Sequence, residues 1–198
     1  VTTPEGERYF GAMAACVNFA FANRQIITHF VRQAWQETFG NNDPLTLLYD
    51  VAHNIAKWEN HFGRKVLVHR KGATRALPVG HPQNPPCFAK TGHPALIPGS
   101  MGTASYIVVG TAKNKETFHS VNHGAGRLMS RRAAQRSISL SQFEKSMGEI
   151  IYNLPFHKVA DEAPGAYKDI EEVVEVLVKE SLTEKVARLK PLAVIKGV

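Results

Sequence analysis

A helical repeat of apolar residues runs through residues 5–38 and constrains the fold more than any other feature. Large apolar side chains recur every three or four residues: Phe10, Met13, Val17, Phe21, Ile27, Val31 and Trp35. We therefore predict one long helix or two abutting helices, ended by Gly40 and the turn residues 41–44. We interpret the apolar stripe as core, and we place Cys16, which stands among small apolar residues, in the same core.

Beyond residue 44 the pattern changes to short apolar stretches separated by glycines and prolines. We predict strands over 45–52, 65–69, 96–97, 106–110 and, apart from Pro191, 186–196, and an extended segment over 150–159. We predict helices over 127–136, 140–149 and 170–181, with Ser139 or Ser141 as the N-cap of the second. Because helices and strands do not alternate regularly, we expect an α+β fold with mixed helices and strands in one compact unit over residues 1–198.

The composition is that of a folded, basic protein. Of the 198 residues 43% are hydrophobic, which argues against disorder, and no apolar run approaches the roughly 18 residues of a membrane span. The N-terminal residues lack the layout of a signal peptide, and the two cysteines cannot form a disulfide framework or a zinc quartet. We therefore expect a cytoplasmic protein that does not associate with membranes.

Positive charge is concentrated outside one acidic stretch. The formal charge is +7, yet residues 161–184 carry eight acidic residues and two lysines, a net charge of −6, so the remainder carries +13. A basic balance of this kind favours a polyanionic partner. We expect the acidic stretch to face away from that partner.

The segment 122–131 (NHGAGRLMSR) is the strongest candidate for chemistry. Gly124 and Gly126 let the backbone approach a ligand and present N–H groups to an anion, and a helix that begins here would direct its positive dipole end to the same point. On that helix Arg127 and Arg131, four residues apart, would share one face and clamp phosphate oxygens. His123 would then lie beside a phosphate, as a nucleophile that could form a histidine–phosphorus bond. The alternative is an ordinary glycine turn with a surface histidine.

Three further segments carry weaker signals. His53, between an apolar stretch and polar Asn54, stands where metal or phosphate ligands often lie, although a histidine with this spacing is more often buried and hydrogen-bonded than a metal ligand. The basic loop 69–75 could follow a nucleic-acid backbone or could be a solvated turn. The loop 98–105, with two glycines and three hydroxyl side chains, suits a phosphate or nucleoside pocket and also suits any tight turn.

Taken in order, these motifs resemble the RtcB family, GTP-dependent RNA ligases that join a 3′-phosphate to a 5′-hydroxyl in tRNA splicing. The segments that carry the resemblance span nearly the whole chain: NFA with ANRQ (18–25), YDVAHNIAK (49–57), VHRKGATR (68–75), LIPGSMGTASY (96–106), HGAGR through MSR (123–131), YKD (167–169), and RLKPL through KG (188–197). Each motif is modest evidence alone, and the ordered set is specific.

The resemblance implies roles for individual residues. His123 corresponds to the histidine nucleophile that takes GMP from GTP, and His53 corresponds to a ligand of the Mn²⁺ centre. Polar residues that hold RNA or its terminal phosphate are matched by Asn54, Lys71, Arg127 and Arg131. Positions around the guanine nucleotide are matched by Ser100, Ser105, Tyr167 and Lys196, together with Gly124, Ala125 and Gly126 of the glycine turn. The implied reaction passes GMP from His123 to the RNA 3′-phosphate, after any 2′,3′-cyclic phosphate is opened, and the 5′-hydroxyl then expels GMP.

Family members are about twice as long as this chain. Their first half supplies an Asp, a Cys and two further histidines to the metal centre, and neither Cys16 nor Cys87 stands in a matching context. Because the chain begins at Val1 without a Met, we expect it to be the C-terminal part of a ligase whose N-terminal half is absent. The resemblance names tRNA halves or broken RNA as substrates, archease as a candidate activating partner, and the N-terminal half as a further partner.

Two other functions stay open at this point. One is a non-catalytic RNA-binding remnant that kept the basic surface. The other is a different histidine-based phosphotransferase that acts through His123.

Overall fold

The computed structural model describes residues 1–40 and 45–197 and contains both helices and strands, as expected for an α+β protein. Its contacts group into two compact units, Val1–Lys71 and Gly72–Val198. We describe each unit by itself, and the single unit that the sequence predicts stays a prediction. No helix in the described ranges is long and apolar enough to cross a membrane.

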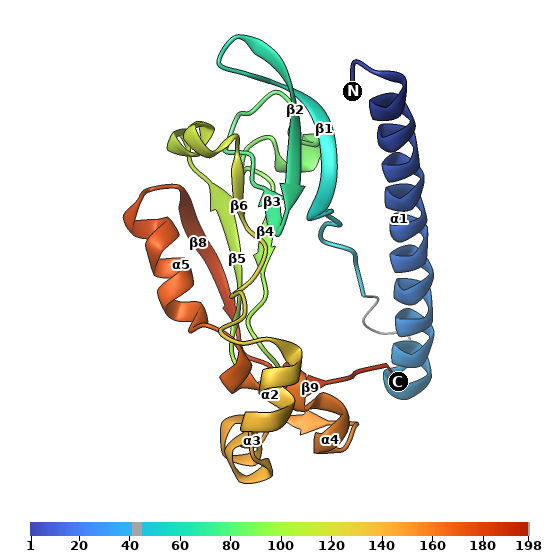
Figure 1. Cartoon of the computed structure of the whole chain (residues 1–198), viewed down its shortest axis with the longest axis vertical. Helices are drawn as coiled ribbons and strands as arrows, with labels where there is room; N and C mark the ends of the chain where they lie inside the picture. The colour runs from blue at the N-terminus through green and yellow to red at the C-terminus, as the bar shows by residue number, and fades with distance from the viewer. Residues whose placement is uncertain (41–44, 198) are drawn as a thin grey trace. The chain divides into compact units, whose positions relative to one another are not determined.

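The first unit begins with one uninterrupted helix, α1 (Pro4–Phe39) (Figure 1). Thr3 caps its start by accepting a hydrogen bond from the Gly6 N–H at 3.2 Å, and Gly40 ends it at φ +79°. The predicted end at Gly40 is therefore confirmed, whereas residues 41–44 lie outside the described residues.

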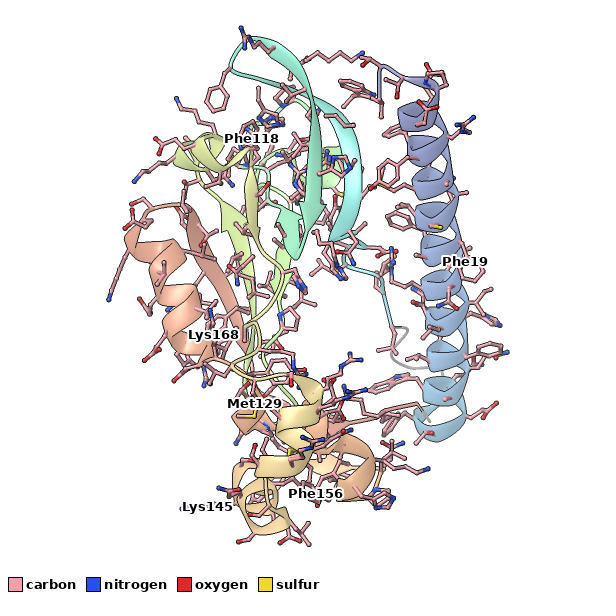
Figure 2. All side chains as sticks on the ribbon, viewed as in Figure 1. Phe19, Phe118, Met129, Lys145, Phe156 and Lys168 are labelled. Atoms are coloured by element: carbon pink, nitrogen blue, oxygen red, sulfur yellow. The ribbon has the colours of Figure 1, made fainter. Side chains whose placement is uncertain are left out.

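The prediction that the apolar stripe of α1 is core is wrong. The helix has no buried residue: Phe10, Met13, Val17 and Trp35 are half-buried, and Phe19, labelled in Figure 2, is 74% exposed. Cys16 is exposed as well, contrary to expectation. Helical spacing shows which side chains share a face, but what covers that face depends on the rest of the protein.

A hairpin completes the first unit. Strands β1 (Asn54–His61) and β2 (Arg64–Lys71) pair antiparallel, and the turn residues Phe62 and Gly63 both have positive φ, as in a type I′ turn. The prediction of a strand over 65–69 is confirmed, but the predicted strand over 45–52 is wrong. Arginines of α1 hold that segment instead: Arg24 Nε donates to the Asp50 carboxylate at 2.7 Å, and Arg32 Nε donates to the Leu45 carbonyl at 2.8 Å.

The second unit is built on a three-stranded antiparallel sheet in the order β4 (Ala95–Ile97), β5 (Ser105–Gly110) and β8 (Thr183–Leu189). Helix α5 (Ile170–Lys179), capped by Asp169, buries Ile170 and Val174 in the same core as Ile97, Tyr106 and Val108. A short pair, β3 (Ala73–Arg75) and β6 (Ser120–Asn122), adds Val121 to that core. The strands predicted over 96–97 and 106–110 and the amphipathic helix predicted over 170–181 are confirmed.

A second cluster of buried residues forms below this sheet in Figure 1. Helix α3 (Leu140–Met147), capped by Ser139, buries Phe143 and Met147 against α4 (Phe156–Val159) and its neighbours. Strands β7 (Ile151–Tyr152) and β9 (Ala193–Val194) pair parallel beside it. The 3₁₀ helices of this unit are η1 (Pro86–Phe88), η2 (Ala112–Thr117), η3 (Ala160–Glu162) and η4 (Pro164–Ala166).

Three predicted elements have the wrong bounds. Helix α2 spans Arg131–Ser137 rather than 127–136, because Ser130 caps it and Arg127 is extended. Only Ile151–Tyr152 of the extended segment 150–159 is a strand, since Pro155 begins helix α4. The strand predicted over 186–196 divides at Pro191 into β8 and β9.

Candidate nucleotide and phosphate site

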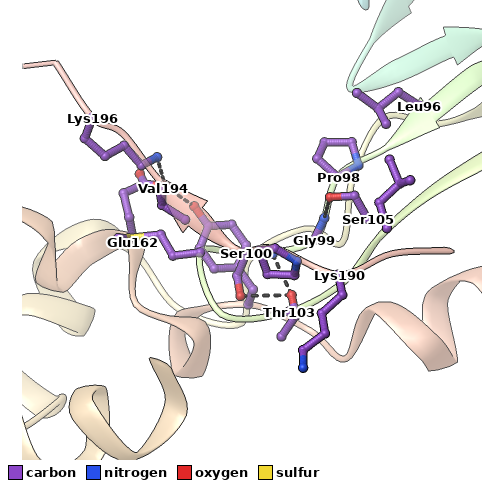
Figure 3. A pocket seen from close by; sticks show the side chains of 14 residues that line it. Leu96, Pro98, Gly99, Ser100, Thr103, Ser105, Glu162, Lys190, Val194 and Lys196 are labelled. Carbon is purple, nitrogen blue, oxygen red and sulfur yellow. Dashed lines mark hydrogen bonds and ion pairs between the residues drawn. The ribbon is translucent and has the colours of Figure 1, made fainter. Parts of the chain in front are cut away.

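A cavity of about 420 Å³ opens in the second unit between three segments of the chain. One wall is the loop 98–105 that joins β4 to β5, another is formed by Glu162 and Tyr167, and the third is the C-terminal segment 189–196 (Figure 3). Four candidates for nucleotide contact from the sequence line this one cavity: Ser100, Ser105, Tyr167 and Lys196. The structure thus brings together residues that lie up to 96 positions apart in the chain.

Hydroxyl groups hold the loop 98–105 in a tight shape. The Ser100 N–H donates to Thr103 Oγ1 at 2.7 Å, and the two hydroxyl oxygens of these residues lie 3.0 Å apart. The Gly99 N–H lies 3.4 Å from Ser105 Oγ, and a Cβ on Gly99 would collide with the Ala104 carbonyl oxygen. This loop therefore requires glycine at position 99 and presents serine hydroxyls along the cavity.

Lys196 is held in place by its backbone. The Lys196 N–H donates to Asn153 Oδ1 at 2.9 Å, and the Asn153 amide donates back to the Lys196 carbonyl at 3.0 Å. With the backbone fixed in this way, Lys196 Nζ lies 3.8 Å from Glu162 Oε2, the ion pair drawn in Figure 3. The cavity therefore has a cation and an anion side by side at one edge.

The glycine turn 124–126 lies against this cavity. The Ala125 N–H donates to the Pro98 carbonyl at 3.1 Å. Two further backbone hydrogen bonds join the residues around Arg127 to those around Tyr167: the Leu128 N–H donates to the Ala166 carbonyl at 2.9 Å, and the Lys168 N–H donates to the Gly126 carbonyl at 3.0 Å. Arg127 and Tyr167 thus form an antiparallel bridge in place of the first turn of a helix. The prediction that Arg127 and Arg131 share a helix face is wrong, as is the prediction that a helix dipole begins beside His123.

His123 is half-buried and lies against Gly72. The backbone N–H of His123 donates to the Gly72 carbonyl at 3.3 Å, and a Cβ on Gly72 would lie 3.4 Å from His123 Cδ2. Gly72 has φ +71°, so that glycine both turns the chain and leaves room for the imidazole ring. The backbone N–H groups of His123 and Ala125 already have acceptors within the protein. These two N–H groups are therefore not presented to an anion in the way that the sequence predicts for the glycine turn.

Arg127 uses its guanidinium within the protein. Nε donates to the Met129 carbonyl at 3.1 Å, Nη1 donates to Tyr167 Oη at 2.9 Å, and Nη2 donates to the Asp161 carbonyl. The guanidinium carbon also lies 4.8 Å from the centre of the Tyr167 ring. These contacts link Arg127 to Tyr167 and use three of the five N–H groups of the guanidinium.

Tyr167 in turn donates to Glu162 Oε2 at 2.6 Å. Burial first, and then the hydrogen bond to Glu162, raise the pKa of Tyr167 to about 12. The phenol therefore stays protonated at neutral pH and keeps donating to the carboxylate.

Two acidic residues lie at this site, contrary to the expectation that the stretch 161–184 faces away. Arg131 Nε lies 3.7 Å from Asp161 Oδ2, and Arg131 Nη2 lies 3.9 Å from Glu162 Oε1. Sequence reasoning missed both acids, because η3 and η4 turn the chain back on itself and bring the start of the acidic stretch to the arginines. No periodic pattern in the sequence marks that turn.

The remaining candidates lie in the first unit, at the open end of its hairpin. His53 directly precedes β1, rather than following a strand as predicted, and Asn54 is the register partner of Lys71. All three residues are exposed. Across the described part of the chain, no group of three or more His, Cys, Asp or Glu residues is arranged to hold a metal ion.

Comparison with known proteins agrees with these motifs. The family model described as tRNA-splicing ligase RtcB matches residues 1–197. The protein named tRNA-splicing ligase RtcB from Pyrococcus abyssi is 49% identical over 205 residues, which cover 98% of this chain and 22% of that protein. The protein of the same name from Thermococcus kodakarensis is 48% identical, over 98% of this chain and 42% of its own length. The RNA-splicing ligase RtcB of Mycobacterium tuberculosis is 46% identical, over the whole chain and 46% of its own length. This chain therefore spans less than half the length of these relatives.

Proposed function

The chain belongs to the RtcB family, and from that premise we propose that it carries the guanylyl-transfer part of an RNA ligase. The reaction joins an RNA 3′-phosphate, or an opened 2′,3′-cyclic phosphate, to a 5′-hydroxyl in tRNA splicing or RNA repair. The observation that carries the proposal is the gathering of Ser100, Ser105, Tyr167 and Lys196 around one cavity beside the turn that follows His123. We place this reaction in the cytoplasm.

The cavity suits a guanine nucleotide in size and in polarity. About 420 Å³ lies within the roughly 300–1,000 Å³ of small-molecule sites. Serine hydroxyls, an ammonium group and a carboxylate at its wall supply both donors and acceptors, which guanine requires because its edge carries both. Pro98, Leu189 and Val194 add apolar side chains to the lining.

In the proposed reaction a ring nitrogen of His123 attacks the α-phosphorus of GTP. A nitrogen–phosphorus bond forms, the bond between the α-phosphorus and the bridging oxygen breaks, and pyrophosphate leaves. GMP then passes to the RNA 3′-phosphate and frees His123, and the RNA 5′-hydroxyl attacks the activated phosphate and expels GMP. Gly72 keeps the imidazole accessible by its lack of a side chain.

In this proposal basic and polar side chains bind RNA. Arg131 is 73% exposed and has only long contacts to carboxylates, so it is available to a phosphate. Asn54 and Lys71 offer an amide and an ammonium group at the end of the hairpin. Arg127 contributes by holding Tyr167.

The Mn²⁺ centre that the resemblance implies does not fit the described residues of this chain alone. His53 is a single candidate ligand, whereas a catalytic metal site needs about three protein ligands. We derive no step through the metal. We propose that the further metal ligands come from the N-terminal half of the ligase and that archease is an activating partner.

Transfer of labelled GMP tests the proposal. Incubation of the full-length protein with Mn²⁺ and α-³²P-GTP should leave acid-labile label on the protein, and His123→Ala should abolish it. His157→Ala is the matched control, because His157 is an exposed histidine of α4 that does not line the cavity. Label from γ-³²P-GTP instead would favour a different phosphotransferase, and salt-dependent RNA binding without any label would favour a non-catalytic remnant.

A further inference from the structure

The Glu162 carboxylate lies where the nucleotide cavity meets the arginines, and its two oxygens face different neighbours. Oε2 accepts the hydrogen bond of Tyr167 at 2.6 Å and lies 3.8 Å from Lys196 Nζ. Oε1 lies 3.6 Å from Arg127 Nη1 and 3.9 Å from Arg131 Nη2. One side chain of 26% exposure thus contacts two residues that are candidates for binding nucleotide, Tyr167 and Lys196, and two that are candidates for binding RNA, Arg127 and Arg131.

The contacts of the two carboxylate oxygens differ in strength. The contact to Tyr167 is short and directional, and burial and that hydrogen bond keep the phenol protonated. The contact to Arg131 is long, and the Arg131 side chain is 73% exposed, so water competes for it. Glu162 is therefore firmly joined to the cavity wall and loosely joined to Arg131.

The two arginines differ in the same way. Arg127 donates to two carbonyls and to a phenol oxygen, so its release would break three hydrogen bonds. Arg131 gives up only two long ion pairs when it turns to a ligand. A doubly charged terminal phosphate offers Arg131 shorter, two-pronged hydrogen bonds than either carboxylate does in its present position.

We propose that Glu162 is the positioning residue that joins the two halves of the site. It holds Tyr167 and Lys196 at the nucleotide cavity, and it pairs with Arg131 until the 3′-phosphate of an RNA end replaces it. The inference rests on the proposed function, because it assigns the cavity to guanosine and Arg131 to RNA. Glu162 acts through these neighbours and takes no part in bond making.

Two substitutions separate the two tasks of Glu162. Glu162→Gln keeps an oxygen that accepts from Tyr167 but removes the charge that faces Arg131. Glu162→Ala removes both. The probes are guanosine, which tests the cavity without a phosphate, and a pair of short RNAs that differ only in a 3′-phosphate or a 3′-hydroxyl end.

We expect the two variants to differ with guanosine and to agree with RNA. Glu162→Gln should bind guanosine within about twofold of the unaltered protein, whereas Glu162→Ala should bind it roughly tenfold more weakly, since Tyr167 loses its acceptor. Both variants should bind the 3′-phosphate RNA roughly two- to fivefold more tightly, because a carboxylate no longer competes for Arg131. Glu172→Gln is the matched control for loss of one negative charge, since Glu172 is an exposed residue of α5, and it should change neither affinity.

The possible results separate this inference from the proposed function. If the unaltered protein does not bind guanosine, the proposed function of the cavity is overturned. If it binds guanosine but Glu162→Gln leaves the preference for the 3′-phosphate end unchanged, or weakens guanosine binding as much as Glu162→Ala does, the role of Glu162 is overturned. A Glu162→Ala protein that fails to fold leaves the decision to Glu162→Gln and to Arg131→Ala, which should reduce the preference for the 3′-phosphate end.

Discussion

Arg127→Lys tests whether Arg127 stabilises the site through its hydrogen bonds to other residues of the protein. Lysine keeps the charge but loses the fork that reaches the Met129 carbonyl, Tyr167 Oη and the Asp161 carbonyl at once. A typical net hydrogen bond contributes about 0.5–1.5 kcal/mol, and one ammonium group could replace one of the three. Because the side chain is a quarter exposed, water satisfies part of the remainder, so we expect a loss of about 2 kcal/mol in the free energy of unfolding.

The assay is urea denaturation followed by far-ultraviolet circular dichroism, since both tryptophans, Trp35 and Trp58, lie in the first unit and do not report on the second. The midpoint should fall while the slope stays unchanged. The salt dependence of RNA binding is the second readout: Arg127→Ala, which removes the charge, should leave its slope unaltered, and Arg131→Ala should lower the slope by about 0.7. If Arg127→Lys retains full stability and Arg127→Ala lowers the salt slope as Arg131→Ala does, Arg127 is a phosphate ligand and does not act only by supporting Tyr167.

Three further predictions follow from other contacts. Arg70→Ala should cost about 3–5 kcal/mol of stability in denaturant unfolding, because it leaves the buried Glu59 carboxylate without its two-pronged partner at 2.8 Å, and a stable variant would contradict this. Burial lowers the pKa of His93 from 6.5 to about 4, so as the pH falls the unfolded chain binds a proton before the folded protein does. The contribution of His93 to the free energy of unfolding should be complete above pH 6.5 and should fall by up to about 3 kcal/mol towards pH 4. His93→Gln should remove this pH dependence of stability. Gly72→Ala should destabilise by about 1 kcal/mol at φ +71° and reduce GMP transfer to His123, whereas an unchanged labelling rate would show that the ring tolerates the new methyl group.

Local chemistry made several elements predictable. Helix α3 begins at Ser139 because its hydroxyl accepts from the Gln142 N–H while the Gln142 side chain accepts from the Ser139 N–H. Helix α5 has one apolar face, and the strands on either side of the loop 98–105 are apolar runs bounded by Gly and Pro. These signals are carried by neighbouring residues, so one sequence suffices to read them.

The errors arose where distant partners decide the local structure. Arg127 follows a glycine turn and precedes a helix, yet it is extended, because its neighbours Gly126 and Leu128 hydrogen-bond to the backbone on either side of Tyr167, 40 residues later. Glu162 belongs by sequence to an acidic stretch, yet its carboxylate lies among cations. The gathering of the cavity residues was accessible only through the resemblance, since propensity and periodicity place no residue relative to another 96 positions away.

The segment 193–196, which forms part of the cavity wall and is held by Asn153, can detach without unfolding of the rest of the protein. Strand β9 has only two residues and is tied to β7 and Asn153 rather than to the three-stranded sheet. Its detachment exposes little buried apolar surface, so the free energy of this local opening lies well below that of global unfolding. Amide hydrogens of residues 193–196 would then exchange with solvent long before those of β5. A bound nucleotide that contacts Lys196 would slow that exchange in proportion to its affinity, and the end of the chain thereby becomes a reporter of occupancy that requires no catalysis.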